Sequence, residues 1–205
     1  MRLHYCTPSP NSRKVESLIG YLGVSVDRDF VDLFKGAQRS ASFLALNPNG
    51  KIPVLEDGDF VLWESHAILV YLASLHPEKQ LLPGDARGRA DVERWMAWLQ
   101  AHFSPNVGKV MLERVLKKLS GGTPDEAALA QGTAGFESMA RILDQHLAGR
   151  EFLCGALTIA DFAIGPWAEA APMCALGYSD YPSIAAWLER VTRLPGWVAQ
   201  PNLGR

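Results

Sequence analysis

Glu64 and Ser65 have the side chains and the position to hold a carboxylate. They follow a predicted strand at Phe60–Trp63 and open a predicted helix near 65–75. At this junction the free amides and the positive end of the helix dipole face outward, and such an end attracts a carboxylate. The alternative interpretation is that Ser65 only caps the helix, as serine commonly does.

The three cysteines, Cys6, Cys154 and Cys174, carry little chemistry on their own. Their odd number and the lack of C-x-x-C spacing argue against a disulfide framework and against a zinc ribbon, so no metal site is predicted. We interpret Cys154 and Cys174 as small buried hydrophobic residues. Cys6 lies at the end of the first predicted strand, close to where a redox centre would lie, but alone it cannot do dithiol chemistry.

Thr158 and Asp161 have the spacing of a capping box at the start of a helix. Thr158 can accept from the amide of Asp161, and the Asp161 carboxylate can reach back to the amide of Thr158. Leu157 and Phe162 have the spacing of a hydrophobic staple. We therefore expect Asp161 to have a structural role and not a catalytic one.

The first 76 residues alternate strands and helices. Short β patterns lie at Arg2–Cys6, Val26–Val31, Ile52–Glu56 and Phe60–Trp63, with helical patterns near 12–22, 39–46 and 65–75. The first two strands are separated by a helix and should be parallel, whereas the turn at 57–59 should make the last two antiparallel. The order βαβ, α, ββα suggests an α+β, thioredoxin-like domain.

After a linker at 77–86, residues 87–205 read as an all-helical bundle. Helical patterns cover 87 to about 120, 124–148, 158–171 and a segment near 183–192. Ser104-Pro105 should interrupt the first of these, because proline cannot donate a helical hydrogen bond.

Composition excludes several classes of protein. The formal net charge is −2 and the pI is near 6.2, so nucleic acid and anionic membranes are not expected partners. No apolar run is long enough for a membrane span, and Met1–Tyr5 leads into a strand pattern instead of a signal sequence. We expect a cytoplasmic protein.

The stretches N-P-N-G-K-I-P-V-L, at 47–55, and L-W-E-S-H-A-I-L-V-Y-L, at 62–72, resemble the glutathione transferase family. The resemblance implies a cis Pro53, with Ile52 offering its backbone to the cysteinyl part of glutathione by β-augmentation. It also implies that Glu64 and Ser65 hold the γ-glutamyl end. The capping box and P-x-I-x-x-W at 182–187 extend the resemblance to nearly the whole chain.

The resemblance leaves open which residue stabilises the thiolate of glutathione. Ser9 stands six residues before Val15, as the serine does in serine-using members, and it is our first choice. Asn11 is second, because a bacterial branch with threonine in the Ser9 position uses an asparagine two residues later. Tyr5 is the rival, since mammalian-type members place a catalytic tyrosine at the end of the first strand.

Four residues in the flanking loop and helix could hold the glycine carboxylate of glutathione. We choose Gln38 and Lys51, and interpret Lys35 and Arg39 as solvated surface residues.

The electrophile should bind between the domains. Phe103, Val107 and Met111 follow helical steps on the long helix, with Trp167 opposite. These residues either line that pocket or belong to the core.

The leading hypothesis is a homodimeric glutathione transferase that conjugates the thiolate to a small hydrophobic electrophile. Two alternatives stay open: a glutathione-dependent disulfide reductase or peroxidase, favoured by the Ser9-x-Asn11 arrangement, and a non-catalytic transferase-like binding protein. The sequence does not name the electrophile.

Overall fold

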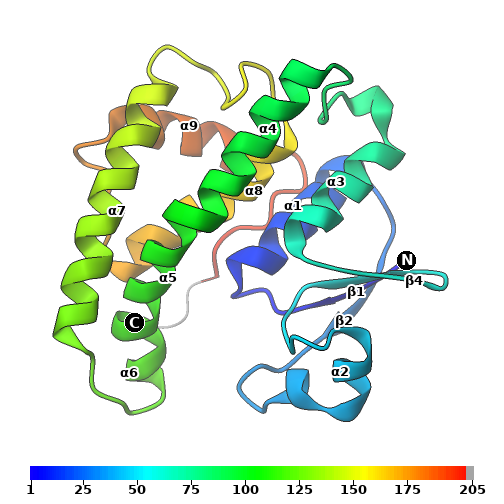
Figure 1. The fold of residues 1–205 in the computed structure, drawn as a ribbon, viewed down its shortest axis with the longest axis horizontal. Coiled ribbons are helices and arrows are strands. Elements are labelled where there is room, and N and C mark those ends of the chain that lie inside the picture. The colour runs from blue at the N-terminus through cyan, green and yellow to red at the C-terminus, as the bar shows by residue number, and fades with distance from the viewer. Residues whose placement is uncertain (202–205) are drawn as a thin grey trace.

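The computed structural model describes residues 1–201, and its N-terminal part is a four-stranded sheet with helices on both faces (Figure 1). The elements are β1 (Arg2–Tyr5), α1 (Pro10–Leu22), β2 (Asp27–Phe30), α2 (Ala41–Leu46), β3 (Val54–Asp57), β4 (Phe60–Trp63) and α3 (Ser65–Leu75). The strand order is β2-β1-β3-β4. As predicted, β1 and β2 are parallel, and β3 and β4 are antiparallel. The thioredoxin-like fold is confirmed.

Alternating side chains of β1 assign the two faces of the sheet. Leu3 joins the main core together with Val15 of α1 and Leu72 of α3. His4 points to the other face, where its ring meets the edge of Phe43 of α2. Helices α1 and α3 therefore cover one face and α2 the other (Figure 1).

The C-terminal part is helical, as predicted. Its helices are α4 (Ala86–Trp98), α5 (Ser104–Met111), α6 (Lys117–Leu119), α7 (Glu126–Leu147), α8 (Ile159–Ala170) and α9 (Pro182–Thr192). The interruption expected at Ser104-Pro105 is a π-helical turn at Leu99–Phe103, directly before Pro105, and not a break. A π turn accommodates a residue without an N–H while the chain stays helical. A second π turn follows at Leu112–Leu116.

The α1–α8 contact joins the two parts of the chain. On α1, Arg13 has no exposed surface, and its Nη1 donates to Glu169 Oε2 of α8 at 2.6 Å. Two turns along, Tyr21 packs edge-on against Phe162, with ring centroids 5.4 Å apart. Leu81, between α3 and α4, is also buried, and its carbonyl accepts from the amide of Ile159. One hydrophobic core therefore runs through both parts.

The capping box at the start of α8 is present. Asp161 has no exposed surface, and its carboxylate accepts from the amides of Leu153 and Thr158 and from Nε1 of Trp187. Burial raises the pKa of Asp161 to about 6, although these hydrogen bonds favour the charged form. Every oxygen of this carboxylate serves the local fold, which agrees with the structural role expected for it.

Candidate functional site

Three chain segments meet at one edge of the sheet, the one formed by the end of β1, the start of β3 and the end of β4. In the strand register, Val54 at the start of β3 lies between His4 of β1 and Trp63 of β4. The residues that follow β1, precede β3 and follow β4 therefore leave the sheet on the same side. This topology brings the segment leading to Ser9, the Ile52-Pro53 bond and Glu64-Ser65 to one edge.

The Ile52-Pro53 peptide bond is cis. The loop before it is organised by Asn47, which is buried and whose side chain donates to the carbonyl of Lys51 at 2.7 Å and accepts from the amide of Asn49 at 3.0 Å. Gly50 has a φ of +60°, which suits a residue without a side chain. The N-P-N-G-K segment thus fixes the entry to β3, and Ile52 lies directly before this strand, outside its ladder.

Glu64 and Ser65 form the junction between β4 and α3. Glu64 is the N-cap residue, and its φ of +72° is unusual for a residue other than glycine. Within the described chain no side chain caps α3, and Ser65 is its first helical residue. The interpretation of Ser65 as a simple cap is therefore wrong. The first amides of α3 and the Ser65 hydroxyl stay available for an anion.

Two further residues lie at this junction, Lys14 of α1 and His66 of α3, and neither was predicted from the sequence. Lys14 is only 2% exposed, and its Nζ lies 3.5 Å from Ser65 Oγ and 3.2 Å from His66 Nε2. Burial lowers the pKa of Lys14 to about 7, against the raising effect of Glu64. The pKa of His66 is lowered to about 3, first by burial and then by Lys14. No sequence signal distinguishes Lys14 from a surface lysine, because its burial depends on the packing of α3 against α1.

Ser9 is the N-cap residue of α1 and is partly exposed, but its hydroxyl does not cap the helix in the described structure. Ser12, in contrast, is fully buried and accepts from the amide of Cys6 at 3.1 Å, which is a structural role. Cys6 is also buried, and this burial raises the pKa of its thiol. Tyr5 packs against Phe30, with ring centroids 5.9 Å apart. Among residues 1–201, the hydroxyl of Ser9 is thus left available for a ligand.

Asn11 and Trp167 connect the N-terminal loop to α8. Nε1 of Trp167 donates to Asn11 Oδ1 at 3.0 Å. Because an indole N–H can only donate, the Asn11 amide must turn its oxygen toward Trp167. The Nδ2 hydrogens of Asn11 are then left for another acceptor. The Trp167 ring also lies 3.7 Å from the position that a Cβ on Gly108 of α5 would occupy. Met111, one turn further along α5, is partly exposed.

Phe103 and Val107 do not line an accessible pocket. Both have no exposed surface. Phe103 stacks on Trp98 and also packs against Phe136 of α7. These two residues pack in the core, because α7 covers the face of the helix that carries them, and this burial favours the core over the pocket among the two alternatives from the sequence.

Gln38 and Lys51 lie near one another at the side of the cis-proline loop. The carbonyl of Gln38 is 3.2 Å from the position that a Cβ on Gly50 would occupy. Oε1 of Gln38 is buried without a hydrogen-bond partner among the described residues, and Lys51 is exposed. Lys35 is 85% exposed and pairs with Asp32 across 3.4 Å, and Arg39 is also exposed.

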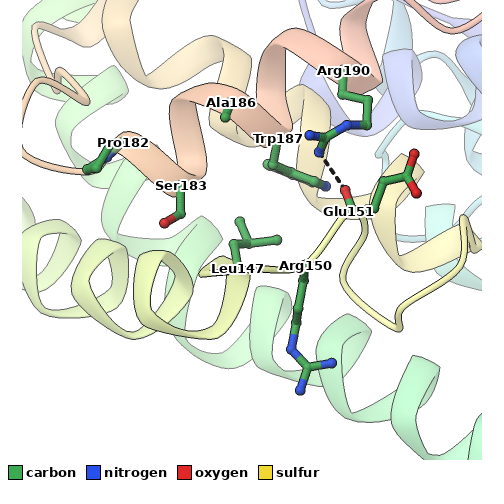
Figure 2. Close-up of a pocket in the computed structure, with 9 residues that line it drawn as sticks. Leu147, Arg150, Glu151, Pro182, Ser183, Ala186, Trp187 and Arg190 are labelled. Carbon is green, nitrogen blue, oxygen red and sulfur yellow. Dashed lines mark hydrogen bonds between the residues drawn. The ribbon is translucent and has the colours of Figure 1, made fainter.

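An open hollow of about 530 Å³ lies elsewhere, between the end of α7 and α9. Figure 2 shows Trp187 at its centre, and Arg190 donating to the carbonyl of Glu151. It contains none of the residues expected to bind glutathione or an electrophile.

The described residues contain neither a membrane-spanning helix nor a cluster suited to a metal ion. Among residues 1–201, no helix combines the length and the apolar character that a membrane crossing requires. The same residues hold no cluster of three or more His, Cys, Asp or Glu side chains that suits a metal ion.

Comparisons with known proteins agree with this architecture. Models of the glutathione S-transferase N-terminal and C-terminal domains match residues 1–74 and 126–190. Glutathione S-transferase 3 of Zea mays is 34% identical, over 96% of this chain and 91% of that protein. A glutathione S-transferase structure from Pseudomonas fluorescens has a TM-score of 0.88 at 30% identity, covering 98% of each chain. A glutathione transferase of Burkholderia graminis, with two glutathione molecules bound per subunit, has a TM-score of 0.85 at 27% identity, covering 96% of this chain and 85% of that one.

Proposed function

Because the chain belongs to the glutathione S-transferase family, we propose that it binds glutathione at the sheet edge described above and conjugates its thiolate to a small apolar electrophile. The observation that carries this proposal is the convergence of three groups at one edge. They are the cis Ile52-Pro53 bond, the uncapped start of α3 at Ser65, and the free hydroxyl of Ser9.

Each part of glutathione has a proposed partner at this edge. The cysteinyl backbone pairs with the N–H and C=O of Ile52, as an added strand would. The α-carboxylate of the γ-glutamyl end accepts from Ser65 and the amides of α3, and Glu64 faces its ammonium. The glycine carboxylate contacts Gln38 and Lys51.

Ser9 is the proposed thiolate donor, which would place this protein in the serine-using, bacterial-like branch of the family. A free thiol has a pKa of about 8.5, so the site must lower it by one to two units for the thiolate to form at neutral pH. A hydroxyl donor at the N-terminal end of α1 can do this. Asn11, with its Nδ2 hydrogens free, is the second donor, and Tyr5 is the rival.

Replacement of Ser9 tests this assignment. We expect Ser9→Ala to raise the thiol pKa of bound glutathione by about one to two units and to slow conjugation at neutral pH. Tyr5→Phe is the matched control, and it should leave both unchanged. The measurements are the ultraviolet thiolate absorbance of the complex against pH and the rate with an aryl halide. An unchanged pKa in Ser9→Ala, with a raised pKa in Tyr5→Phe, would transfer the role to Tyr5.

We place the electrophile against Met111 and Trp167. Trp167 of α8 is hydrogen-bonded to Asn11, so an electrophile in contact with Trp167 would lie close to the proposed thiolate. The chemical class of the electrophile is left to substrate profiling, since the fold alone does not select it.

A glutathione-dependent disulfide reductase is the second candidate. Asn11 offers a second donor beside Ser9, and the Burkholderia graminis relative holds two glutathione molecules per subunit. The reaction would convert one disulfide and two glutathione molecules into two thiols and glutathione disulfide. Turnover of hydroxyethyl disulfide well above that of an aryl halide would select this function, and the reverse order would select conjugation. Asn11→Ala should affect the disulfide reaction more strongly.

We also propose a homodimer in the cytoplasm. Strand β4 is at the edge of the sheet and exposes Phe60 and Trp63, a combination that another surface normally covers. The free cysteines suit a reducing compartment. Light scattering of the purified protein gives the mass, and a monomer at micromolar concentration would contradict the dimer.

A further inference from the structure

Lys14 is a buried cation directly behind the start of α3. The residue is 2% exposed, and its ammonium contacts Ser65 Oγ at 3.5 Å and His66 Nε2 at 3.2 Å. A buried ammonium is costly unless it is paired, and in the described chain Lys14 has no carboxylate within salt-bridge distance. A cation in this position is therefore poised for an anion that arrives from outside.

The direction of these hydrogen bonds follows from the chemistry of lysine. An ammonium can only donate, so both Ser65 Oγ and His66 Nε2 accept. His66 is then neutral, with its proton on Nδ1. The Ser65 hydroxyl, with one lone pair engaged by Lys14, directs its own hydrogen away from Lys14.

We propose that Lys14 is a positioning residue of the γ-glutamyl subsite: its ammonium orients the Ser65 hydroxyl toward the α-carboxylate of glutathione and adds a buried positive charge behind the helix end that receives it. This inference rests on the proposed function, since it requires glutathione to bind at this edge. Lys14 acts through Ser65 and does not touch the ligand itself.

The charges around Lys14 make its protonation sensitive to the ligand. Glu64 and His66 are the titratable groups that face it from α3. On α1, Arg13 pairs with Glu169 of α8. Burial raises the pKa of Glu16, against the lowering effects of Arg28 of β2 and of Arg13, and Glu16 forms no ion pair with Lys14 among the described residues. With a pKa of about 7, Lys14 is partly neutral in the free protein, and an added carboxylate raises this pKa. Binding should therefore take up a proton near and above pH 7.

Calorimetry with S-methylglutathione measures this uptake in the unmodified protein. The methyl group removes the thiol proton, and His66, with a pKa of about 3, does not titrate in this range. Titrations near pH 7.5, in buffers of different ionisation enthalpy, should show a fraction of a proton taken up per ligand. Binding without proton uptake overturns the proposed role of Lys14 but not the proposed function. No binding of S-methylglutathione overturns the proposed function, and this inference with it.

A variant pair separates positioning from folding. Lys14→Met should weaken S-methylglutathione binding by about tenfold and abolish the proton uptake. Removing a buried charge should not lower the melting temperature. Lys118→Met, at an exposed position on α6, is the matched control and should change nothing. For the analogue in which 4-aminobutanoate replaces the γ-glutamyl group, and which lacks only the α-carboxylate, Lys14→Met should have no effect. An equal loss for both ligands contradicts the proposal.

Discussion

His66 illustrates how one side chain at the site can be held neutral by its neighbours. It lies at the start of α3, partly buried, with Lys14 donating to its Nε2. The folded state keeps its pKa at about 3, whereas the ordinary value is 6.5. Protonation of His66 would place a second positive charge beside Lys14. The neutral imidazole therefore allows the Lys14 ammonium to stay in contact with Ser65.

This neutral histidine predicts acid lability. The folded pKa is below the unfolded one, so the stability that depends on it is fully present above about pH 6.5 and is lost as pH falls toward 3. His66→Gln keeps an acceptor for Lys14 but does not titrate. Between pH 6.5 and about 4 the wild type should lose about 2 kcal/mol more unfolding free energy than the variant. Urea unfolding at several pH values measures this difference.

Asp161 provides an internal check on that experiment. Its folded pKa is raised, so its contribution is lost as pH rises through about 6, opposite in sign to that of His66. Both proteins contain Asp161, so it cancels in the difference between them. Parallel pH profiles for the wild type and His66→Gln would show that His66 is protonated in the folded protein.

At the scale of elements, the close approach of α1 to the chain after α9 depends on two glycines. A Cβ on Gly20 of α1 would lie 2.3 Å from the carbonyl oxygen of Gly196, and Gly196 itself has a φ of +74°. Backbone atoms cannot rotate away as a side chain can. Close beside this contact, the amide of Val198 donates to Ser17 Oγ at 3.0 Å.

Gly20→Ala should therefore destabilise the protein, although alanine favours a helix by about 1 kcal/mol over glycine. We expect a net loss of about 2 kcal/mol, because the backbone of one segment must move. Gly108→Ala is the matched control: it lies inside α5, and its added Cβ would make ordinary contact with Trp167 at 3.7 Å. It should be neutral or slightly stabilising. Denaturant midpoints compare the two, and an equal change in both would remove the steric argument.

The elements themselves were largely predictable from local patterns. The strands, the order of the helices and the capping box at Thr158 follow from alternation, turn residues and caps, which are local signals. It was less predictable which face of α5 the core covers. Helical steps group Phe103, Val107 and Met111, but whether a ligand or α7 covers them depends on the approach of α7. That approach is close at Gly132, where an added Cβ would lie 2.9 Å from Val110.

The candidate site also contains residues that could be predicted from the sequence and residues that could not. The cis Ile52-Pro53 bond and the strand-to-helix junction at Glu64-Ser65 could be predicted, because a short sequence motif encodes each of these backbone features, whereas their contacts with glutathione stay a prediction. Lys14 and Arg13 could not, since each looks like a surface residue on a helix until α3 and α8 are packed against α1. The polar residues in the first turns of α1 are compatible with an exposed helix end in the sequence and with a helix covered on two sides in the structure.

At the scale of the whole molecule, α1 connects the thioredoxin-like half to the helical half. One side of this helix carries three residues spaced four apart, Arg13, Ser17 and Tyr21. Arg13 reaches Glu169 of α8, and Nη2 donates to the carbonyl of Pro166 at 2.5 Å. Glu169 in turn accepts from Nε1 of Trp197 at 3.1 Å. Without the helical half, this face of α1 would expose apolar surface and lose the partner of a buried guanidinium.

The two parts should therefore not fold independently, although each matches its own family model. We expect a fragment of residues 1–80 to show no cooperative thermal transition, because breaking a buried ion pair alone costs about 3–5 kcal/mol, a large share of the stability of a small domain. The full chain should unfold in one transition, with tryptophan fluorescence and far-ultraviolet circular dichroism coinciding. In the full chain, Glu169→Gln should lower the single midpoint without splitting it, since Arg13 belongs to the shared core. A fragment that melts cooperatively, or two separate transitions in the full chain, would show that the halves are autonomous and that α8 only docks against a finished domain.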